Sequence, residues 1–160
     1  MTSGAPEPNA ESAAGLRQMV LSLQPQELGV DPGTLPHGVW GILLETGSER
    51  GAYTLVVLAD GTTSLYFSTG GGIIGAGAHE TVRSAAAVFL RVASRYASDA
   101  RPSSAPPLPQ AGDTAFHFLT ADGLRSYLAR EADLGEGRDY LSSLFHAGHA
   151  VISELRQLDL

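Results

Sequence analysis

The sequence contains neither cysteine nor lysine. The absence of cysteine excludes disulfide bonds, thiol nucleophiles and zinc sites built on thiolates. The absence of lysine excludes a Schiff base and the lysine of a phosphate-binding loop. Several common catalytic and cofactor-binding chemistries are therefore closed to this chain.

Positive charge is scarce, and long apolar runs are absent. The formal net charge is −7, and the ten arginines are dispersed along the chain. Because nucleic-acid binding depends on neutralising phosphates, we expect no nucleic-acid partner. No segment approaches the ~20 apolar residues of a membrane-spanning helix, and we expect no membrane partner. The first fifteen residues lack the basic start and apolar stretch of a secretory signal. We expect a soluble, cytoplasmic protein, and the preference for Arg, Ala, Gly and Pro is typical of GC-rich bacterial coding.

A length of 160 residues suits one domain, which at this size buries roughly 70% of the surface of its unfolded chain. Residues 1–10 are small, polar and proline-bearing, so they predict a disordered tail. Residues 11–160 predict a single α+β domain, in which residues 98–112 form a proline-rich connecting loop.

Hydrophobic periodicity predicts three helices, at residues 11–23, 79–97 and 138–158. The short apolar run Val39 to Glu45 predicts a strand. Two further strand pairs flank Asp60-Gly61 and Asp122-Gly123, because Asp-Gly favours the tight turn of a β-hairpin.

The first hairpin has apolar residues on both faces. Such a hairpin belongs in a sheet that is covered on both sides, by helices or by a second subunit. With Asp60-Gly61 as a two-residue turn, the register follows directly. This turn pairs Leu58 with Thr63, Val56 with Leu65 and Thr54 with Phe67.

The predicted element order is α-β-β-β-α-β-β-α, and its five strands form a mostly antiparallel sheet. The expected fold class is therefore α/β, of the α+β type. This order is similar to that of the small profilin-like folds, such as roadblock, longin and PAS-type modules. The resemblance implies a binding or dimerisation platform. It lies in topology alone, and no functional residue is carried over with it.

A shift of 62 residues aligns the two hairpin-helix halves of the sequence. Ala59-Asp60-Gly61 falls on Ala121-Asp122-Gly123, and the apolar stripes of the two later helices coincide. Identity is otherwise sparse. Both an ancestral duplication and a chance agreement of two amphipathic units remain open.

The segment STGGGIIGAG, residues 68–77, contains the pattern G-x-G-x-x-G. A dinucleotide site needs this pattern in a parallel βαβ unit, whereas here it follows a hairpin. Besides a mobile lid or a contact surface, two interpretations remain. The glycines allow positive φ angles and close backbone approach, or the loop and the following helix bind a small anion. The candidate ligand-binding residues are Ser68, Thr69, Gly70, Gly71, Gly72, Gly75, Gly77, His79 and Arg83.

Other candidate sites are weaker. His146 and His149 lie on adjacent turns of one helix, but zinc needs three or four ligands, and we expect no metal or other cofactor. His117 alternates with two phenylalanines, which is typical of a sheet histidine with satisfied hydrogen bonds. The acidic residues, Glu45 among them, are considered as paired carboxylates, but most lie in turns or solvated loops. The nucleophile elbow G-x-S-x-G is absent, and we assign no catalytic residue.

These observations favour a non-catalytic protein-interaction or regulatory module, self-associating as a homodimer and open to a protein partner. The alternative is a binding protein or an enzyme that binds a nucleotide or another small anionic ligand through residues 68–79. Aromatic residues concentrate at interface centres. The candidate interface anchors are Trp40, Tyr53, Tyr66 and Phe67.

Overall fold

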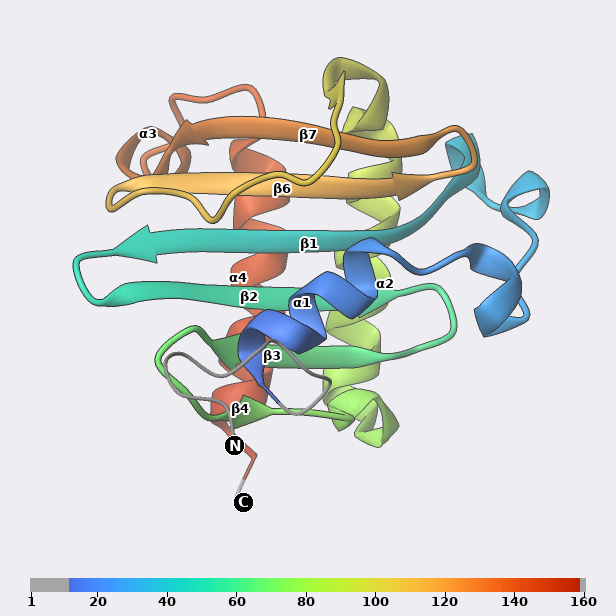
Figure 1. Cartoon of the computed structure of the whole chain (residues 1–160), viewed down its shortest axis with the longest axis horizontal. Coiled ribbons are helices and arrows are strands. Elements are labelled where there is room, and N and C mark those ends of the chain that lie inside the picture. Colours follow the sequence, from blue (N-terminus) through green and yellow to red (C-terminus); the bar gives the residue numbers. More distant parts are fainter. Residues whose placement is uncertain (1–11, 159–160) are drawn as a thin grey trace, which may run out of the picture.

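The computed structural model describes residues 12–158 and arranges them as an antiparallel sheet with helices on both faces (Figure 1). The tail predicted for residues 1–10 lies outside the described residues. The helices are α1 (Ala13–Leu21), α2 (Glu80–Tyr96), α3 (Glu131–Gly135) and α4 (Ser142–Arg156). The 3₁₀ helices are η1 (Pro25–Leu28), η2 (Pro32–Thr34), η3 (Pro36–Gly38), η4 (Ala76–Ala78) and η5 (Ala97–Asp99). The strands are β1 (Val39–Ser48), β2 (Gly51–Leu58), β3 (Thr63–Phe67), β4 (Gly72–Ile73), β5 (Arg101–Pro102), β6 (Asp113–Thr120) and β7 (Gly123–Arg130).

The mixed α+β class and the antiparallel sheet are confirmed, but the expected number of strands was wrong. The sheet has seven strands in the order β4-β3-β2-β1-β6-β7-β5. The two additional strands, β4 and β5, have two residues each and lie at the edges. Segments this short carry no detectable period in the sequence. β4, before α2, pairs with β3 at one edge of the sheet, and β5, after α2, pairs with β7 at the other edge.

The first hairpin has a different register from the one expected. The amide of Leu58 donates to the carbonyl of Thr62 at 2.9 Å, so the turn contains three residues, with Gly61 at φ +97°. A glycine in this conformation is typical of three-residue hairpin loops. The slip of one residue changes which side chains of β3 share a face with those of β2. The structure pairs Val57 with Thr63, Leu55 with Leu65 and Tyr53 with Phe67.

The predicted hairpin at Asp122-Gly123 is present, as the β6-β7 pair. Thr120 pairs with Gly123, so the two turn residues are Ala121 and Asp122, and the turn lies one residue earlier than the Asp122-Gly123 turn that we expected. The same Ala-Asp-Gly sequence therefore closes two hairpins with turns of different length.

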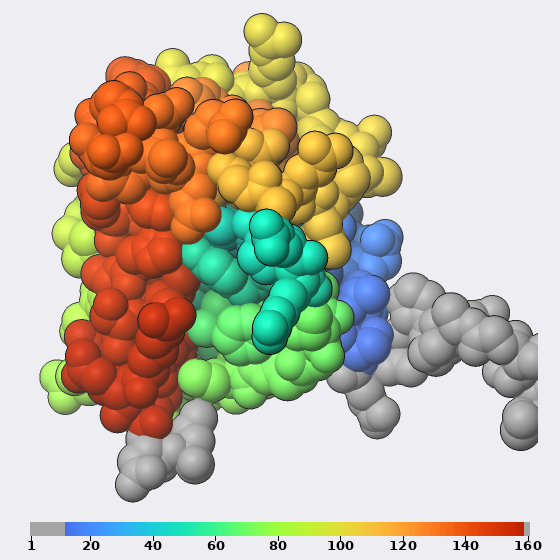
Figure 2. Space-filling view, turned by 90° about the vertical axis from the view of Figure 1, so that its left-hand side faces the viewer, coloured from blue at the N-terminus to red at the C-terminus, as the bar shows by residue number. Residues whose placement is uncertain are grey.

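Both faces of the sheet are covered by this chain, as the apolar hairpin predicts. α2 and α4 pack on one face around a core that includes Ile42, Leu55 and Phe116. α1 and the segment from η1 to η3 cover the other face around Leu43 and Val56. Figure 2 shows these layers edge on, with α4 in red on one side and α1 in blue on the other. No helix within residues 12–158 is both long and apolar enough to cross a bilayer.

The 62-residue shift aligns the bounds of β2 with those of β6, but it does not align their faces. Leu55 and Val57 belong to the core under α2 and α4. Their counterparts, His117 and Leu119, lie on the opposite face, where Leu119 packs in the α1-side core and His117 bonds to Glu45. The two hairpins flank β1 on opposite sides while both long helices pack on one face. No rotation superposes the two halves with their helices on one face, so the structure favours chance agreement.

Candidate functional site

The glycine segment forms a turn, the short strand β4 and a 3₁₀ helix in succession. The amide of Gly70 donates to the carbonyl of Phe67 at 2.9 Å, and Gly70 and Gly71 have φ angles of +115° and +82°. A Cβ on Gly77 would lie 1.9 Å from the carbonyl oxygen of Gly61. The glycines therefore serve left-handed turns and a close approach of two backbones.

The polar groups of this segment are largely engaged within the protein. The amide of Gly75 donates to Ser64 Oγ at 3.4 Å, and the amide of His79 donates to the carbonyl of Ala76 at 3.1 Å. Arg83 donates to the carbonyl oxygens of Gly77 and Ala78 at 3.3 and 3.2 Å. This arrangement does not resemble a cradle of inward-pointing amides around a phosphate.

The candidate ligand residues are not gathered at one place. The amide of Ser68 donates to the carbonyl of Ala52, at the start of β2. Gly77 approaches Gly61, in the turn after β2. The eight residues of β2 separate these points by about 25 Å at the usual rise of a strand. Ser68 and Thr69 therefore lie far from Gly77 and Arg83.

A cavity of about 810 Å³ lies where the second half of the glycine segment meets α2 and the β2-β3 turn. We call it the α2 cavity. Most of its lining is aliphatic, and its charged residues are Asp60, Arg83 and Arg91. The lining also includes Leu35, Pro36, Val39, Val57, Leu58, Ala59, Gly61, Thr62, Gly75, Gly77, Ala78, Ala86, Ala87, Leu90 and Ser94.

The aromatic residues expected at an interface are mostly buried in the chain itself. Trp40 and Tyr66 are 3% and 4% exposed and pack beneath α1. Neither the indole N–H of Trp40 nor the hydroxyl of Tyr66 has a hydrogen-bond partner within the described residues. Tyr53 is half-buried against the core, and only Phe67, at 37%, is exposed. In the described structure, the N-terminal segment covers Trp40 and Tyr66, so neither side chain lies on the surface.

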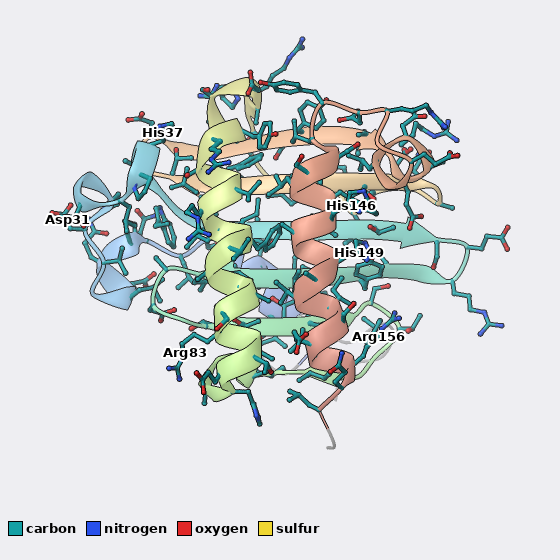
Figure 3. All side chains as sticks on the ribbon, turned by 180° about the vertical axis from the view of Figure 1, so that it is seen from behind. Asp31, His37, Arg83, His146, His149 and Arg156 are labelled. Atoms are coloured by element: carbon teal, nitrogen blue, oxygen red, sulfur yellow. The ribbon has the colours of Figure 1, made fainter. Side chains whose placement is uncertain are left out.

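His146 and His149 lie on α4, far from Arg83 at the start of α2 (Figure 3). His149 contacts the hydroxyl of Tyr53 through Nε2 at 3.2 Å, and its ring lies 4.3 Å from that of Phe145. Burial lowers the pKa of His149. Within residues 12–158, no group of three or more His, Asp or Glu side chains is placed to hold a metal ion.

A buried polar network lies on the α1 face of the sheet, centred on the fully buried Glu45 of β1. Arg17 of α1 donates to it through Nη2 at 2.9 Å, and Thr54 donates through its hydroxyl at 2.7 Å. His117 of β6 contacts the same carboxylate through Nε2 at 2.9 Å. Burial raises the pKa of Glu45, but hydrogen bonds from His117 and Arg17, with their electrostatic attraction, outweigh it and lower the pKa to about 2.

The network continues into the connection between β5 and β6. Residues 103–112 of this connection, which we call the strap, cross in front of β6 (Figure 1). Arg17 Nη2 donates to the carbonyl of Pro106 in the strap at 2.8 Å. Arg17 thereby ties together α1, the sheet and the strap.

A second cavity, of about 700 Å³, lies between the strap and the sheet. We call it the strap cavity. His117 lies at its floor beside Ser126 of β7, whose Oγ is 2.7 Å from His117 Nδ1. The lining also includes Arg101, Ser103, Ser104, Pro106, Pro107, Leu108, Pro109, Gln110, Asp113, Ala115, Tyr127 and Leu128.

Both ring nitrogens of His117 have hydrogen-bond partners, as the sequence-based interpretation expects, but the sequence does not reveal which residues these partners are. Glu45 ends the apolar run VWGILLE, which is an unusual position for an acidic residue with no paired charge. That anomaly is the one available signal. The partner lies 72 residues away, and only the pairing of β1 with β6 brings the two together.

The chain matches no protein-family model, no curated protein and no solved structure.

Proposed function

We propose that the protein is a binding module that holds a small apolar molecule with an acidic group in the α2 cavity. The observation that carries this proposal is the cavity itself. Its volume of about 810 Å³ falls within the usual range of ligand sites, and its lining is mainly aliphatic with few charged groups. The walls suit an alkyl chain or a small ring.

Arg91 supplies the positive charge that would pair with the acidic group of the ligand. Arg83 already donates to two carbonyl oxygens, and Asp60 accepts from the amide of Thr62. Arg91 forms no ion pair within the described residues. It lies two helical turns from Arg83, with Ala87 between them on the same stripe of α2. A carboxylate bound beside Arg91 would form a charge-assisted contact at the mouth of an apolar pocket.

Calorimetric titration with decanoate and with decanol tests this proposal. We expect decanoate to bind, and Ala87→Trp to abolish binding because the indole fills the cavity. Ala150→Trp, at an exposed position on α4, serves as the matched control and should bind normally. Arg91→Gln should weaken decanoate by about tenfold without affecting decanol, whereas Arg95→Gln should change neither. Binding that survives Ala87→Trp, or no binding of either probe, would overturn the proposal.

Self-association, which the sequence favours, has one specific support. Phe67 and Ile74, which is 63% exposed, lie beside β4 at one edge of the sheet. We propose that a second copy of the chain covers these two side chains. Light scattering at micromolar concentration should give the dimer mass for the natural sequence and the monomer mass for Phe67→Ser/Ile74→Ser. Leu128→Ser, exposed near the opposite edge, should remain dimeric; a monomer for the natural sequence would contradict the idea.

A further inference from the structure

The charge of Glu45 fixes where the proton of His117 lies. An ionised carboxylate only accepts hydrogen bonds, so the imidazole nitrogen that contacts it, Nε2, must carry a proton. In the neutral imidazole, Nδ1 then presents its lone pair. The hydroxyl of Ser126, 2.7 Å away, donates to that lone pair. Ser126, His117 and Glu45 therefore form an ordered relay from hydroxyl to base to carboxylate.

The end of this relay faces the strap cavity. Ser126 is half-buried and lines the cavity together with His117. Arg101 of β5 is the direct cross-strand partner of Ser126, which in turn is the partner of His117. Directly opposed residues point to the same face of a sheet, so the three side chains form one row across β5, β7 and β6.

Arg101 adds a positive charge to the row of Arg101, Ser126 and His117. It is exposed, lines the same cavity, and makes no ion pair within residues 12–158. A guanidinium beside a hydroxyl that is bonded to a base can stabilise negative charge on a carbonyl oxygen. Proline and leucine side chains of the strap supply an apolar wall.

We propose that Ser126 is a nucleophile that carboxylic esters acylate in the strap cavity. Ser126 Oγ attacks the ester carbonyl carbon while its proton passes to His117 Nδ1, and the carbonyl oxygen takes up negative charge beside Arg101. The carbonyl re-forms as the bond to the leaving alkoxide breaks, and the alkoxide receives the proton from Nδ1. Water then attacks the acyl-serine with His117 again as the base, which releases a carboxylic acid and restores the hydroxyl.

This activity is independent of the proposed ligand binding. The row across β5, β7 and β6 lies on the α1 face of the sheet, whereas the α2 cavity lies mainly on the α2 face. It also departs from the non-catalytic module that the sequence favours. The missing G-x-S-x-G motif is no obstacle, because this serine lies within a strand and its base comes from the neighbouring one.

Covalent labelling of the full chain tests the proposal. A fluorophosphonate probe, followed by intact mass and peptide mapping, should show one adduct located on Ser126. Ser126→Ala, a small change at a half-buried site, should abolish the adduct. Ser143→Ala, at an exposed position on α4 outside the strap cavity, should leave it unchanged. With p-nitrophenyl acetate, the natural sequence should release p-nitrophenol faster than Ser126→Ala does.

Two further variants separate base catalysis from a structural role. His117→Gln should slow labelling by at least about a hundredfold, because glutamine keeps a polar side chain at this position but cannot accept the proton of Ser126 Oγ. Arg101→Gln, at an exposed position, should slow it by about tenfold. Absence of an adduct on Ser126, or a labelling rate that neither variant changes, would overturn the proposal.

Discussion

Arg17 of α1 and Glu45 of β1 form a bidentate ion pair beneath the strap, with Nη2 2.9 Å from Oε1 and Nε 2.5 Å from Oε2. The carboxylate is fully buried, and the guanidinium is nearly so. This pair fixes α1 against the α1 face of the sheet and, through Pro106, positions the strap over His117. Both the stability of the N-terminal layer and the shape of the strap cavity depend on it.

The effects of removing Arg17 and of removing Glu45 on stability should not be additive. Glu45→Leu should lower the free energy of unfolding by about 3–5 kcal/mol, because it leaves the guanidinium buried without its partner. The double variant Arg17→Met/Glu45→Leu should lose clearly less than the sum of the two single variants. Urea denaturation of Glu45→Leu, Arg17→Met and the double variant measures the three losses in unfolding free energy. Strict additivity would show that the two side chains do not interact.

The stability of the protein should fall in acid through Glu45. Its pKa is about 2 in the folded protein and about 4.5 when unperturbed, so folding favours the ionised form. The stabilisation is fully present above pH 4.5 and is lost as the pH falls towards 2. At 1.36 kcal/mol for each unit of pKa, it amounts to roughly 3 kcal/mol.

Urea denaturation between pH 6 and pH 2.5 checks this prediction, with Glu45→Gln as the comparison. The difference in unfolding free energy between the natural sequence and this variant should shrink as the pH falls. A constant difference over that range would contradict the assignment of the acid sensitivity to Glu45.

Gly75 and Gly77, two of the three glycines that line the α2 cavity, should differ in their tolerance of a methyl group. Gly75 has a φ angle of +74° and nothing within 4 Å of its would-be Cβ, so Gly75→Ala should cost about 1–2 kcal/mol of strain. Gly77→Ala should cost more, because its Cβ would lie 1.9 Å from a backbone oxygen of the β2-β3 turn. Thermal unfolding of both variants ranks them, and equal losses would contradict the close approach.

Gly148, like Gly77, should not tolerate a methyl group, but here side chains rather than backbone atoms occupy the space. A Cβ there would lie 2.6 Å from Leu44 Cδ1 and 3.0 Å from Phe89 Cε1, where α4 packs on α2 and the sheet. Gly148→Ala should therefore lower the unfolding free energy by about 1–3 kcal/mol through overpacking. Gly135→Ala, whose Cβ would meet only Phe145 at 3.9 Å, should not lower it. A harmless Gly148→Ala would show that α4 can move away from the sheet.

Periodicity in the sequence predicts the long elements because each buries one apolar face. The helix expected at residues 79–97 is α2, Glu80–Tyr96, and the one expected at 138–158 contains α4, Ser142–Arg156. The first helix, expected at 11–23, begins and ends slightly inside those bounds. These elements need no information from distant parts of the chain.

The features that the sequence does not predict depend on distant contacts or on backbone geometry. The edge strands β4 and β5 exist only through their pairing with β3 and β7. The register of the first hairpin depends on a third turn residue, Ala59, which no composition rule marks. The row of Arg101, Ser126 and His117 likewise arises only when three strands come together.

The most direct test of ligand binding in the α2 cavity is an amide NMR titration of the protein with decanoate. The proposal predicts shifts concentrated in residues 58–62, 75–78 and 83–94, with little change in the strap. Shifts confined to the strap, or no shifts at millimolar decanoate, would contradict it.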